Sequence, residues 1–274
     1  MGRLEAGIAA CNRIEKIERS FVGATFLEVG TGRRINTPLA FWLLGAERVI
    51  TVDLNPYLKE ELVKNDLDYI QKNKIEIQNL FEGRIFNDRL NSLLNFIRSE
   101  YNLVDLLKFI NVEYVSPGDA SQLPLSSQSI DFHTSYTVFE HIPPEILKGI
   151  MVEGDRILKD DGLFVHKIDY SDHFSHSDKS ISYINFLQFS DDDWYNIAGS
   201  KYMYMNRLRH DDFISLFQDM NYRILINEPT KNNNLLSVVE GSDFMLNEKF
   251  RHKSKDVLVT TSAWFILNKH KLRV

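Results

Sequence analysis

Two glycines and two carboxylates near the start of the chain have a spacing that suits a site for an adenosine-containing cofactor. The apolar run 25–29 contains Glu28 and leads into Gly30-Thr31-Gly32, and a second apolar run ends at Asp53. Glycine lets the backbone turn tightly and approach a ligand closely. A carboxylate about 20 residues beyond such a turn is placed to accept hydrogen bonds from ribose hydroxyls. The pattern therefore predicts the first half of a nucleotide-binding α/β sheet.

The same loop favours a cationic cofactor over a dinucleotide. A dinucleotide fingerprint has a third glycine that packs closely, and Ile35 stands in that place. Glu28 lies two residues before the first glycine and would repel a pyrophosphate. S-adenosylmethionine (SAM) instead carries a sulfonium and an amino group and has no phosphate. On the glycines alone, a chance turn in another α/β protein remains an open alternative.

Several segments together resemble the class I SAM-dependent methyltransferases. Segment 28–32 is similar to motif I of that family, and Gly118-Asp119-Ala120 is similar to the segment after its third strand. Thr137-Val138-Phe139-Glu140-His141-Ile142 resembles the segment after the fourth strand, and 158–164 resembles the turn before the fifth. These segments follow one another in the order of the family. The chain is therefore identified as a member of it, with a methyltransferase-11-type domain.

The resemblance implies how SAM is held. Asp119 would accept a hydrogen bond from the adenine amine, and the backbone N–H of the next residue would meet a ring nitrogen. Arg34 departs from the family, which usually has a third glycine there; it either pins the loop through a salt bridge or points into solvent. The implied cofactor site consists of Glu28, Gly30, Thr31, Gly32, Asp53, Leu54, Asp119, Ala120 and Ser135.

Candidate general bases follow the fourth and fifth strands. Methyl transfer is an in-line displacement, and a hydroxyl nucleophile usually needs help to lose its proton. Ligands of open α/β sheets lie beyond the carboxyl ends of the strands. His173 with Asp169 or Asp172 could form a carboxylate-oriented imidazole, although the same residues could simply hold the following loop. The catalytic candidates are His173, Asp169, His141 and His166.

Residues 170–209 carry the candidate substrate contacts. Arg207 and Arg209 could clamp an anionic group, or they could neutralise the acidic run 191–193. Tyr170 is the third predicted substrate contact. Aromatic side chains in this section could cover the substrate or form a satellite core: Tyr183, Phe186, Phe189, Trp194, Tyr195, Tyr202 and Tyr204.

The histidines of this section do not define a metal site by their spacing. His173 and His176 lie three residues apart, with Asp169, Asp172 and Asp178 nearby, a set that could suit a divalent ion. Because the segment is not clearly helical, the spacing places them on no common face. We therefore assign no metal from the sequence.

The elements that must position these residues form an α/β fold. Strands alternating with helices predict a Rossmann-like, doubly wound, mostly parallel sheet of seven strands. The resemblance implies that the last strand is inserted antiparallel. Two stretches exceed the usual connections and are interpreted as insertions: a helical one at 57–111 and a substrate-covering one at 170–209. The expected strands are 25–29, 48–52, 112–116, 129–135, 163–168, 223–227 and 257–267.

Length, charge and cysteine content indicate the number of domains, the kind of partner and the location of the protein. The chain has 274 residues, which we interpret as a single domain, 1–274, and its net charge is −6. Acidic charge makes a nucleic-acid partner unexpected. Cys11 is the single cysteine, so no internal disulfide can form, and no apolar run approaches membrane-spanning length. We expect a cytoplasmic protein without a membrane partner, with a homodimer contact through the helical insertion as one option.

The predicted function is SAM-dependent methyl transfer to an oxygen or nitrogen of a small-molecule or sugar-like metabolite. Two alternatives remain open from the residues. One is an NAD-dependent oxidoreductase, which Glu28 and Ile35 disfavour. The other is a protein that binds SAM without catalysis.

Overall fold

A computed structural model describes residues 2–199 and 204–269 of the chain. It divides into two compact units. Unit 1 comprises Met1–Tyr136 and Ile150–Val165, and unit 2 comprises Thr137–Gly149 and His166–Val274. Residues 200–203 of the predicted insertion 170–209, and Tyr202 with them, lie outside the described residues.

Four parallel strands lie entirely within unit 1. They are β1 (Thr25–Val29), β2 (Arg48–Val52), β3 (Val112–Val115) and β4 (Ile130–Tyr136), in the order β3-β2-β1-β4. The four residues that end β1 are buried, as are the four that end β2. Such continuous burial is typical of parallel strands covered on both faces. Because the strands are parallel and in register, their carboxyl ends lie along one edge.

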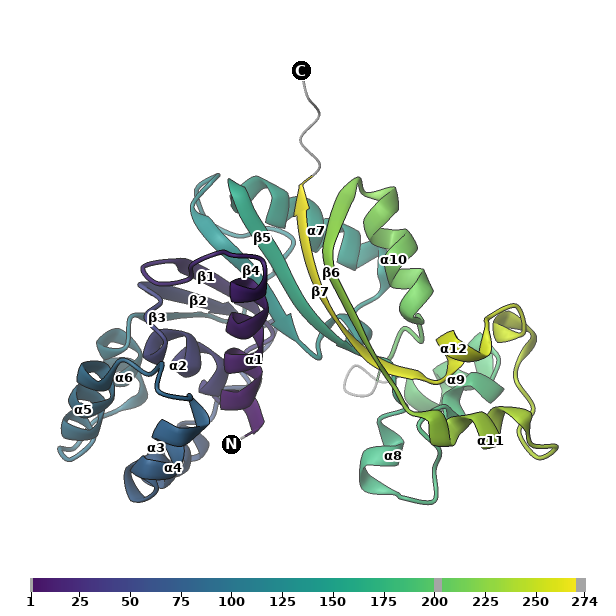
Figure 1. Cartoon of the computed structure of the whole chain (residues 1–274), viewed down its shortest axis with the longest axis horizontal. Coiled ribbons are helices and arrows are strands. Elements are labelled where there is room, and N and C mark those ends of the chain that lie inside the picture. Colours follow the sequence, from purple (N-terminus) through teal and green to yellow (C-terminus); the bar gives the residue numbers. More distant parts are fainter. Residues whose placement is uncertain (1, 200–203, 270–274) are drawn as a thin grey trace. The chain divides into compact units, whose positions relative to one another are not determined.

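Two helices in contact, α1 (Gly2–Lys16) and α2 (Asn36–Leu43), lie in unit 1 (Figure 1). Every residue of α2 is buried. The helices cross closely because α1 has a glycine there: a Cβ atom on Gly7 would lie 2.6 Å from Cβ of Ala40. This crossing fixes α2, which follows the glycine loop directly.

The predicted insertion at 57–111 consists mainly of helices joined by short connections. Apolar residues at helical spacing, such as Leu90, Leu93 and Leu94, are buried. The last of its helices packs beside β3. The insertion contains α3 (Glu60–Lys72), α4 (Lys74–Leu80), α5 (Asn87–Phe96) and α6 (Leu103–Phe109).

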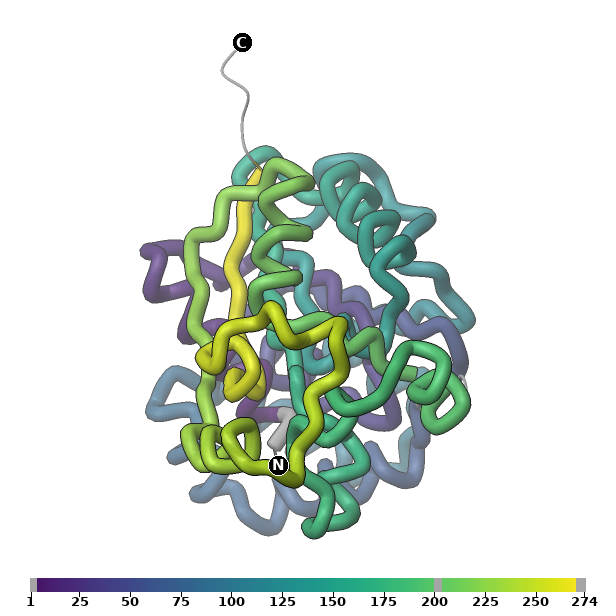
Figure 2. The backbone as a smooth tube through the Cα atoms, turned by 90° about the vertical axis from the view of Figure 1, so that its right-hand side faces the viewer, coloured from purple at the N-terminus to yellow at the C-terminus, as the bar shows by residue number. Residues whose placement is uncertain are grey.

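Three further strands complete a seven-stranded sheet. They are β5 (Leu158–Asp169), β6 (Tyr222–Lys231) and β7 (Thr260–Lys269), and the order of the whole sheet is β3-β2-β1-β4-β5-β7-β6. β6 and β7 are antiparallel and run side by side, with α10 (His210–Asp219) against them (Figure 2). The last strand is thus inserted between β5 and β6. The predicted Rossmann-like sheet with an antiparallel last strand is confirmed.

Three predicted boundaries in this part of the sheet were wrong, and one of them is the end of β6, which lies at Lys231 and not at residue 227. The turn expected at 160–162 is part of β5, which begins at Leu158 directly after α7 (Pro144–Ile157). The last strand begins three residues later than predicted, at Thr260. Residues 255–258 form the short helix α12 (Lys255–Leu258) instead, because the Ser254 side chain caps it by accepting from the backbone N–H of Val257.

Unit 2 has a hydrophobic core of its own, which includes residues of the aromatic section. Phe186 and Trp194 are buried in it, and Phe189 packs against it. The satellite-core alternative therefore holds for these three aromatic residues. The helices of unit 2 not yet given are η1 (Phe139–His141), α8 (Phe174–Ser177), η2 (Asn185–Gln188), α9 (Asp191–Ala198), η3 (Asn233–Leu235), α11 (Leu236–Glu240) and η4 (Glu248–Phe250).

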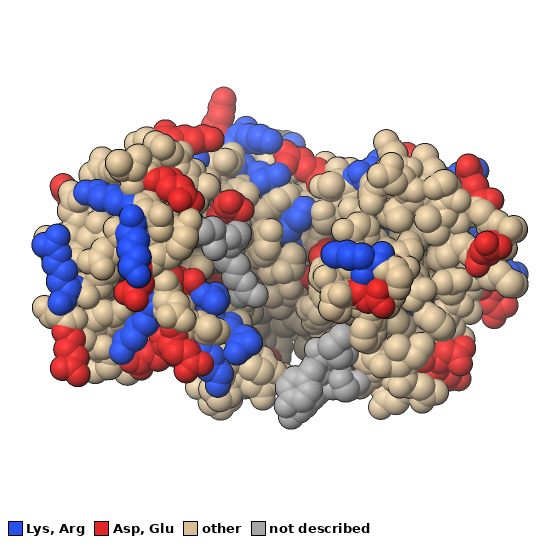
Figure 3. All heavy atoms as spheres, turned by 90° about the horizontal axis from the view of Figure 1, so that it is seen from below, with Lys and Arg blue, Asp and Glu red and all other residues tan. Residues whose placement is uncertain are grey.

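The surface gives no sign of a single-charge face in the view of Figure 3, where basic and acidic side chains of the described residues are interspersed. Among the helices of the described ranges, none is both long and apolar enough to cross a membrane. Cys11 is buried in α1.

Candidate cofactor site and histidine cluster

The glycine loop after β1 has a backbone conformation that only glycine adopts easily. Gly30 and Gly32 have φ angles of 89° and 67°, in the region that side chains disfavour. The N–H of Gly30 donates to the carbonyl of Val52 (2.8 Å), and the N–H of Gly32 donates to Oδ2 of Asp53 (2.6 Å). The loop is therefore held against the end of β2, with the Asp53 carboxylate at its tip.

Glu28 lies beneath this loop. Its side chain is 3% exposed, and its Oε2 accepts a hydrogen bond of 2.6 Å from the hydroxyl of Thr51. That hydroxyl also lies 2.5 Å from the hydroxyl of Thr31. The chain Glu28–Thr51–Thr31 thus links β1, β2 and the loop. Contact of Glu28 with a bound cofactor stays a prediction.

The other predicted cofactor residues follow the neighbouring strands of unit 1. Asp53 is half-buried, and the next residue, Leu54, is 69% exposed at the end of β2. Asp119 is exposed, and its Oδ1 accepts from the N–H (2.8 Å) and hydroxyl (2.7 Å) of Ser121. Ala120 and Ser135 are buried. All nine residues come from segments at the carboxyl ends of β1 to β4, where open α/β sheets bind ligands.

Arg34 pins the glycine loop to the helical insertion. Its guanidinium donates to the carbonyl of Leu62 (3.1 Å) and forms a salt bridge with Asp66, both on α3. Of the two alternatives that the sequence left open, the structure has the salt bridge.

Three histidines and two carboxylates gather in unit 2. The ring centroid of His173 lies 4.7 Å from that of His141 and 4.7 Å from that of His176. Oδ2 of Asp169 lies 3.5 Å from Nε2 of His173, and Oδ1 accepts from the N–H and hydroxyl of Ser171. Of the four catalytic candidates, the structure brings together His141, His173 and Asp169.

The electrostatics of this cluster follow from burial and hydrogen bonds. Burial lowers the pKa of His141, so its imidazole is neutral near pH 7; its Nδ1 lies 2.9 Å from the carbonyl of Tyr204 and must donate to it. Burial acts to raise the pKa of Asp169, but the hydrogen bonds from His173 and Ser171 outweigh it and the pKa is lowered. Asp169 is therefore an ionised carboxylate beside an imidazole.

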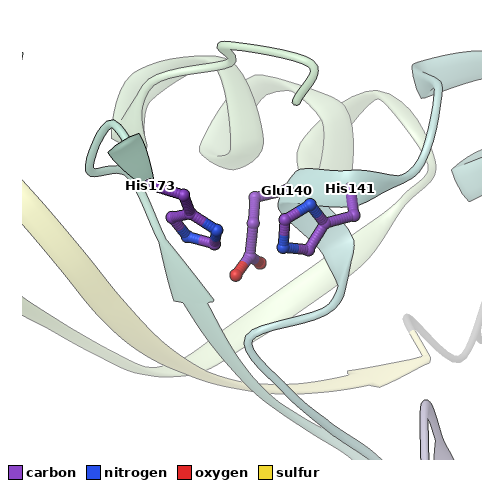
Figure 4. A group of neighbouring side chains, drawn as sticks. All are labelled: Glu140, His141 and His173. Atoms are coloured by element: carbon purple, nitrogen blue, oxygen red, sulfur yellow. The ribbon is translucent and has the colours of Figure 1, made fainter. Parts of the chain in front are cut away.

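Glu140 is the member of the cluster that our prediction missed. Its side chain is 2% exposed, and neither carboxylate oxygen has a hydrogen-bond partner of ordinary geometry. Burial raises its pKa well above the usual range, and the backbone N–H groups of Glu140 and Asp169 offset this only partly. Figure 4 shows the carboxylate between the rings of His141 and His173. The available signal was an acid directly beside a histidine after the fourth strand.

His166 and Tyr170 are not placed to meet a ligand. His166 is fully buried, with its ring 4.2 Å from that of Phe139. Tyr170 is 1% exposed, and its hydroxyl lies 3.3 Å from Nδ1 of His210. We correct the predictions of His166 as a catalytic residue and of Tyr170 as a substrate contact. Alternation along β5 turns the side chain of His166 into the core, and the side chain of Tyr170 is enclosed directly after the end of the strand.

The two arginines hold the chain together instead of clamping an anion. Arg209 is fully buried and donates to the carbonyls of Tyr170, Val257, Leu258 and Thr260, which corrects its predicted role. Burial lowers the pKa of its guanidinium to about 10, so it remains charged near pH 7.

Arg207 is also buried. It donates to the carbonyls of Phe186 and Phe189 and forms a salt bridge with Asp191. The alternative interpretation, neutralisation of the acidic run 191–193, holds for it.

A pocket of about 300 Å³ lies in unit 2 beside Arg207. Trp194, Tyr195 and Tyr204 contribute aromatic walls, and Asp191 and Lys249 contribute charge. Tyr204 also connects the pocket to the cluster, because its carbonyl is the acceptor for His141.

Comparison with known proteins agrees with the fold. Residues 90–166 match the family described as a methyltransferase domain. No curated protein sequence matches the chain.

Two solved structures are similar in fold. One is a protein from Galdieria sulphuraria assigned as a sarcosine dimethylglycine methyltransferase, with 13% identity and a TM-score of 0.52, over 97% of this chain and 86% of that one. The other is a SAM-dependent methyltransferase from Methanosarcina mazei, with 13% identity and a TM-score of 0.50, over 93% of this chain and 96% of that one. At this identity the likeness shows the fold alone.

The domain match over residues 90–166 and the fold both support the predicted class, a class I SAM-dependent methyltransferase with SAM as its methyl donor. The prediction of this class and of its cofactor is confirmed.

Proposed function

We propose that the enzyme transfers the methyl group of SAM to an oxygen or nitrogen of a small-molecule or sugar-like metabolite, in the cytoplasm. The observation that carries the proposal is the pair of His173 and the ionised Asp169, 3.5 Å apart. Such a pair suits a nucleophile that must lose a proton, as a hydroxyl or a protonated amine does. A carbon or sulfur acceptor would have less need of it.

Residues of unit 1 would hold the cofactor. Asp53 would accept from the ribose hydroxyls and Asp119 from the adenine amine, while the exposed side chain of Leu54 would lie against the adenine ring. The glycines allow close approach of the methionine part. When bound, SAM supplies a methyl group on a positively charged sulfur, which the nucleophile attacks in line.

Residues of unit 2 would serve the acceptor. The ring nitrogen of His173 that does not face Asp169 would take the acceptor's proton, and Asp169, which faces Nε2, would stabilise the resulting imidazolium. The pocket beside Tyr204 has the volume of a small-ligand site. Its aromatic walls suit a ring of a sugar-like molecule.

The cofactor half of the proposal is tested by calorimetry. SAM should bind and NAD should give no heat, and Asp53→Ala should weaken SAM at least tenfold, because a ribose contact to a carboxylate is worth about 1.5–3 kcal/mol. Asp68→Ala is the matched control, since Asp68 is exposed in the same unit. Unchanged affinity in Asp53→Ala would remove the ribose assignment.

The acceptor half is tested by turnover. Formation of S-adenosylhomocysteine is followed with a panel of hydroxyl, amine and sugar acceptors. For an acceptor that reacts, His173→Ala should lower kcat about 10²- to 10⁴-fold, the usual contribution of a general base, with SAM affinity unchanged. His252→Ala, which removes an exposed histidine, should react like the wild type. A wild-type rate in His173→Ala rules out the proposed base.

A further inference from the structure

The cluster of unit 2 contains a buried carboxylate whose surroundings do not account for it. Glu140 is 2% exposed, and within the described residues neither of its oxygens has a hydrogen-bond partner of ordinary geometry. A buried polar group without a partner costs about 1–3 kcal/mol, and more when it is charged. A ligand that bonds to Glu140 would remove this cost.

The groups facing Glu140 are imidazoles with the geometry of metal ligands. His141 must donate its Nδ1–H to the carbonyl of Tyr204 (2.9 Å), which leaves the lone pair on Nε2. A histidine that binds a metal through one nitrogen almost always donates the other to such an acceptor. Nε2 of His173 is buried and has no hydrogen bond of ordinary geometry. Both rings flank the carboxylate (Figure 4).

We propose that Glu140, His141 and His173 bind one first-row transition-metal dication, of which Zn²⁺ is the simplest example. One ligand atom from each lies within 4.8 Å of the others. In a tetrahedral site with bonds of about 2.1 Å, ligand atoms are about 3.4 Å apart, so binding would draw the side chains inward by about an ångström. Two imidazoles with one carboxylate suit Zn²⁺ or Mn²⁺ better than Mg²⁺ or Ca²⁺, which prefer oxygen.

The charges around the site favour a dication. An ionised Glu140 would be repelled by the carboxylate of Asp169, and Lys167 is the cation that acts on Glu140. Lys167, however, donates to the hydroxyl of Ser262 (2.7 Å) and lies over the ring of Trp264. A dication between the carboxylate and the imidazoles would compensate both carboxylates directly.

A second arrangement, Asp169 with His173 and His176, shares His173 and is the weaker site. Oδ1 of Asp169 is already taken by the N–H and hydroxyl of Ser171, and Oδ2, which lies 3.5 Å from Nε2 of His173, lies 3.9 Å from Nε2 of His176. The side chain of His176 is half exposed, and its Nε2 lies 3.1 Å from the same hydroxyl. These groups have partners without a metal, so we assign Asp169 and His176 to the surroundings of the site.

The inference does not need the proposed function to be correct, although both involve His173. A neutral imidazole has one basic lone pair, so a cation on Nε2 of His173 and a proton taken from the acceptor would compete for it. Cation binding is therefore measured directly, without reference to methyl transfer.

The experiment is calorimetric titration of the full-length protein, freed of metal by a chelator, with ZnCl₂ near neutral pH. One equivalent of Zn²⁺ should bind, and MgCl₂ should not compete. Glu140→Gln and His141→Ala should each weaken binding at least a hundredfold, whereas His176→Ala should weaken it less than tenfold. His252→Ala, the exposed control, should bind as the wild type does, which separates the site from adventitious surface histidines.

Three results would overturn the proposal. They are no Zn²⁺ binding by the wild type, wild-type binding in Glu140→Gln, and a loss in His176→Ala as large as that in His141→Ala. Glu140→Gln should fold, because it replaces a buried ionisable group by a neutral one of similar size; circular dichroism checks this. If His141→Ala does not fold, Glu140→Gln decides. SAM binding by the same variants shows whether the cofactor site is intact, so failure of either idea is recognised separately.

Discussion

His133 lies in the middle of β4 and is fully buried, with its ring 5.1 Å from that of Phe164. Burial lowers its pKa to about 4, against an ordinary value of 6.5. The folded state therefore keeps the imidazole neutral below pH 6.5, while the unfolded chain takes up a proton there. Stability present above pH 6.5 is lost as the pH falls towards 4, by up to about 3 kcal/mol at pH 4.

Replacement of this histidine should remove that part of the acid sensitivity. Denaturant unfolding of the wild type and of His133→Leu is compared between pH 7 and pH 4. The free energy of unfolding of the wild type should fall by about 3 kcal/mol more than that of the variant. His252→Leu, at an exposed position, should follow the wild type. Parallel curves for the wild type and His133→Leu would show that His133 does not cause the loss.

Residue type alone predicted which side chains carry chemistry, but burial decides which of them are available. A pair of arginines such as Arg207 and Arg209 is typical of a site that binds an anion. Only the structure shows that Arg209 donates to backbone carbonyls and that Arg207 forms a salt bridge with Asp191. Glu140 was missed for the opposite reason. Its partners His141 and His173 come from different segments, and sequence spacing does not show that they converge.

At the scale of elements, the glycine loop is held from two sides. Asp53 accepts from Gly32 at the end of β2, and Arg34 connects the loop to α3 through Leu62 and Asp66. Because the salt bridge is only part-buried, its worth is modest. The salt bridge would favour cofactor binding by holding the loop in its bound conformation, because such a loop loses less entropy when the ligand binds.

Removal of this connection should weaken SAM without unfolding the protein. We expect Arg34→Ala and Asp66→Ala each to raise the Kd for SAM about three- to tenfold in calorimetry. In the double variant the effect should be no larger than in Arg34→Ala alone, because Arg34→Ala already removes the contact with Asp66. Additive losses would mean that Arg34 and Asp66 act on the loop separately. Arg33→Ala, next to Arg34 and exposed, is the control.

The elements themselves were largely predictable from sequence. The apolar runs that became β1 and β2 have the bounds expected for them, because turn residues flank each run. The boundaries were predicted wrongly where turn or helix-cap residues compete with the pairing of strands. Asp160-Asp161-Gly162 reads as a turn, but these residues are extended within β5. The β-branched residues before Thr260 suggested a strand, and the cap at Ser254 began a helix instead.

At the scale of the whole molecule, the two units share a strand. β5 begins in unit 1 and ends in unit 2, since the boundary falls between Val165 and His166. A strand cannot readily lose its pairing at one end while its other end stays in a folded sheet. We therefore propose that residues 1–274 unfold as the single domain predicted from the sequence, in one cooperative transition.

Tryptophan fluorescence can follow each unit separately. Trp42 lies in unit 1, and Trp194 and Trp264 lie in unit 2. Trp42→Phe leaves the reporters of unit 2, and the double variant Trp194→Phe/Trp264→Phe leaves that of unit 1. SAM at 100 times its Kd should add about 2.7 kcal/mol to the free energy of unfolding, and both reporters should show the same increase. If SAM raises the melting temperature seen by Trp42 but not that seen by the other two, the units unfold independently, and the single-domain interpretation is wrong.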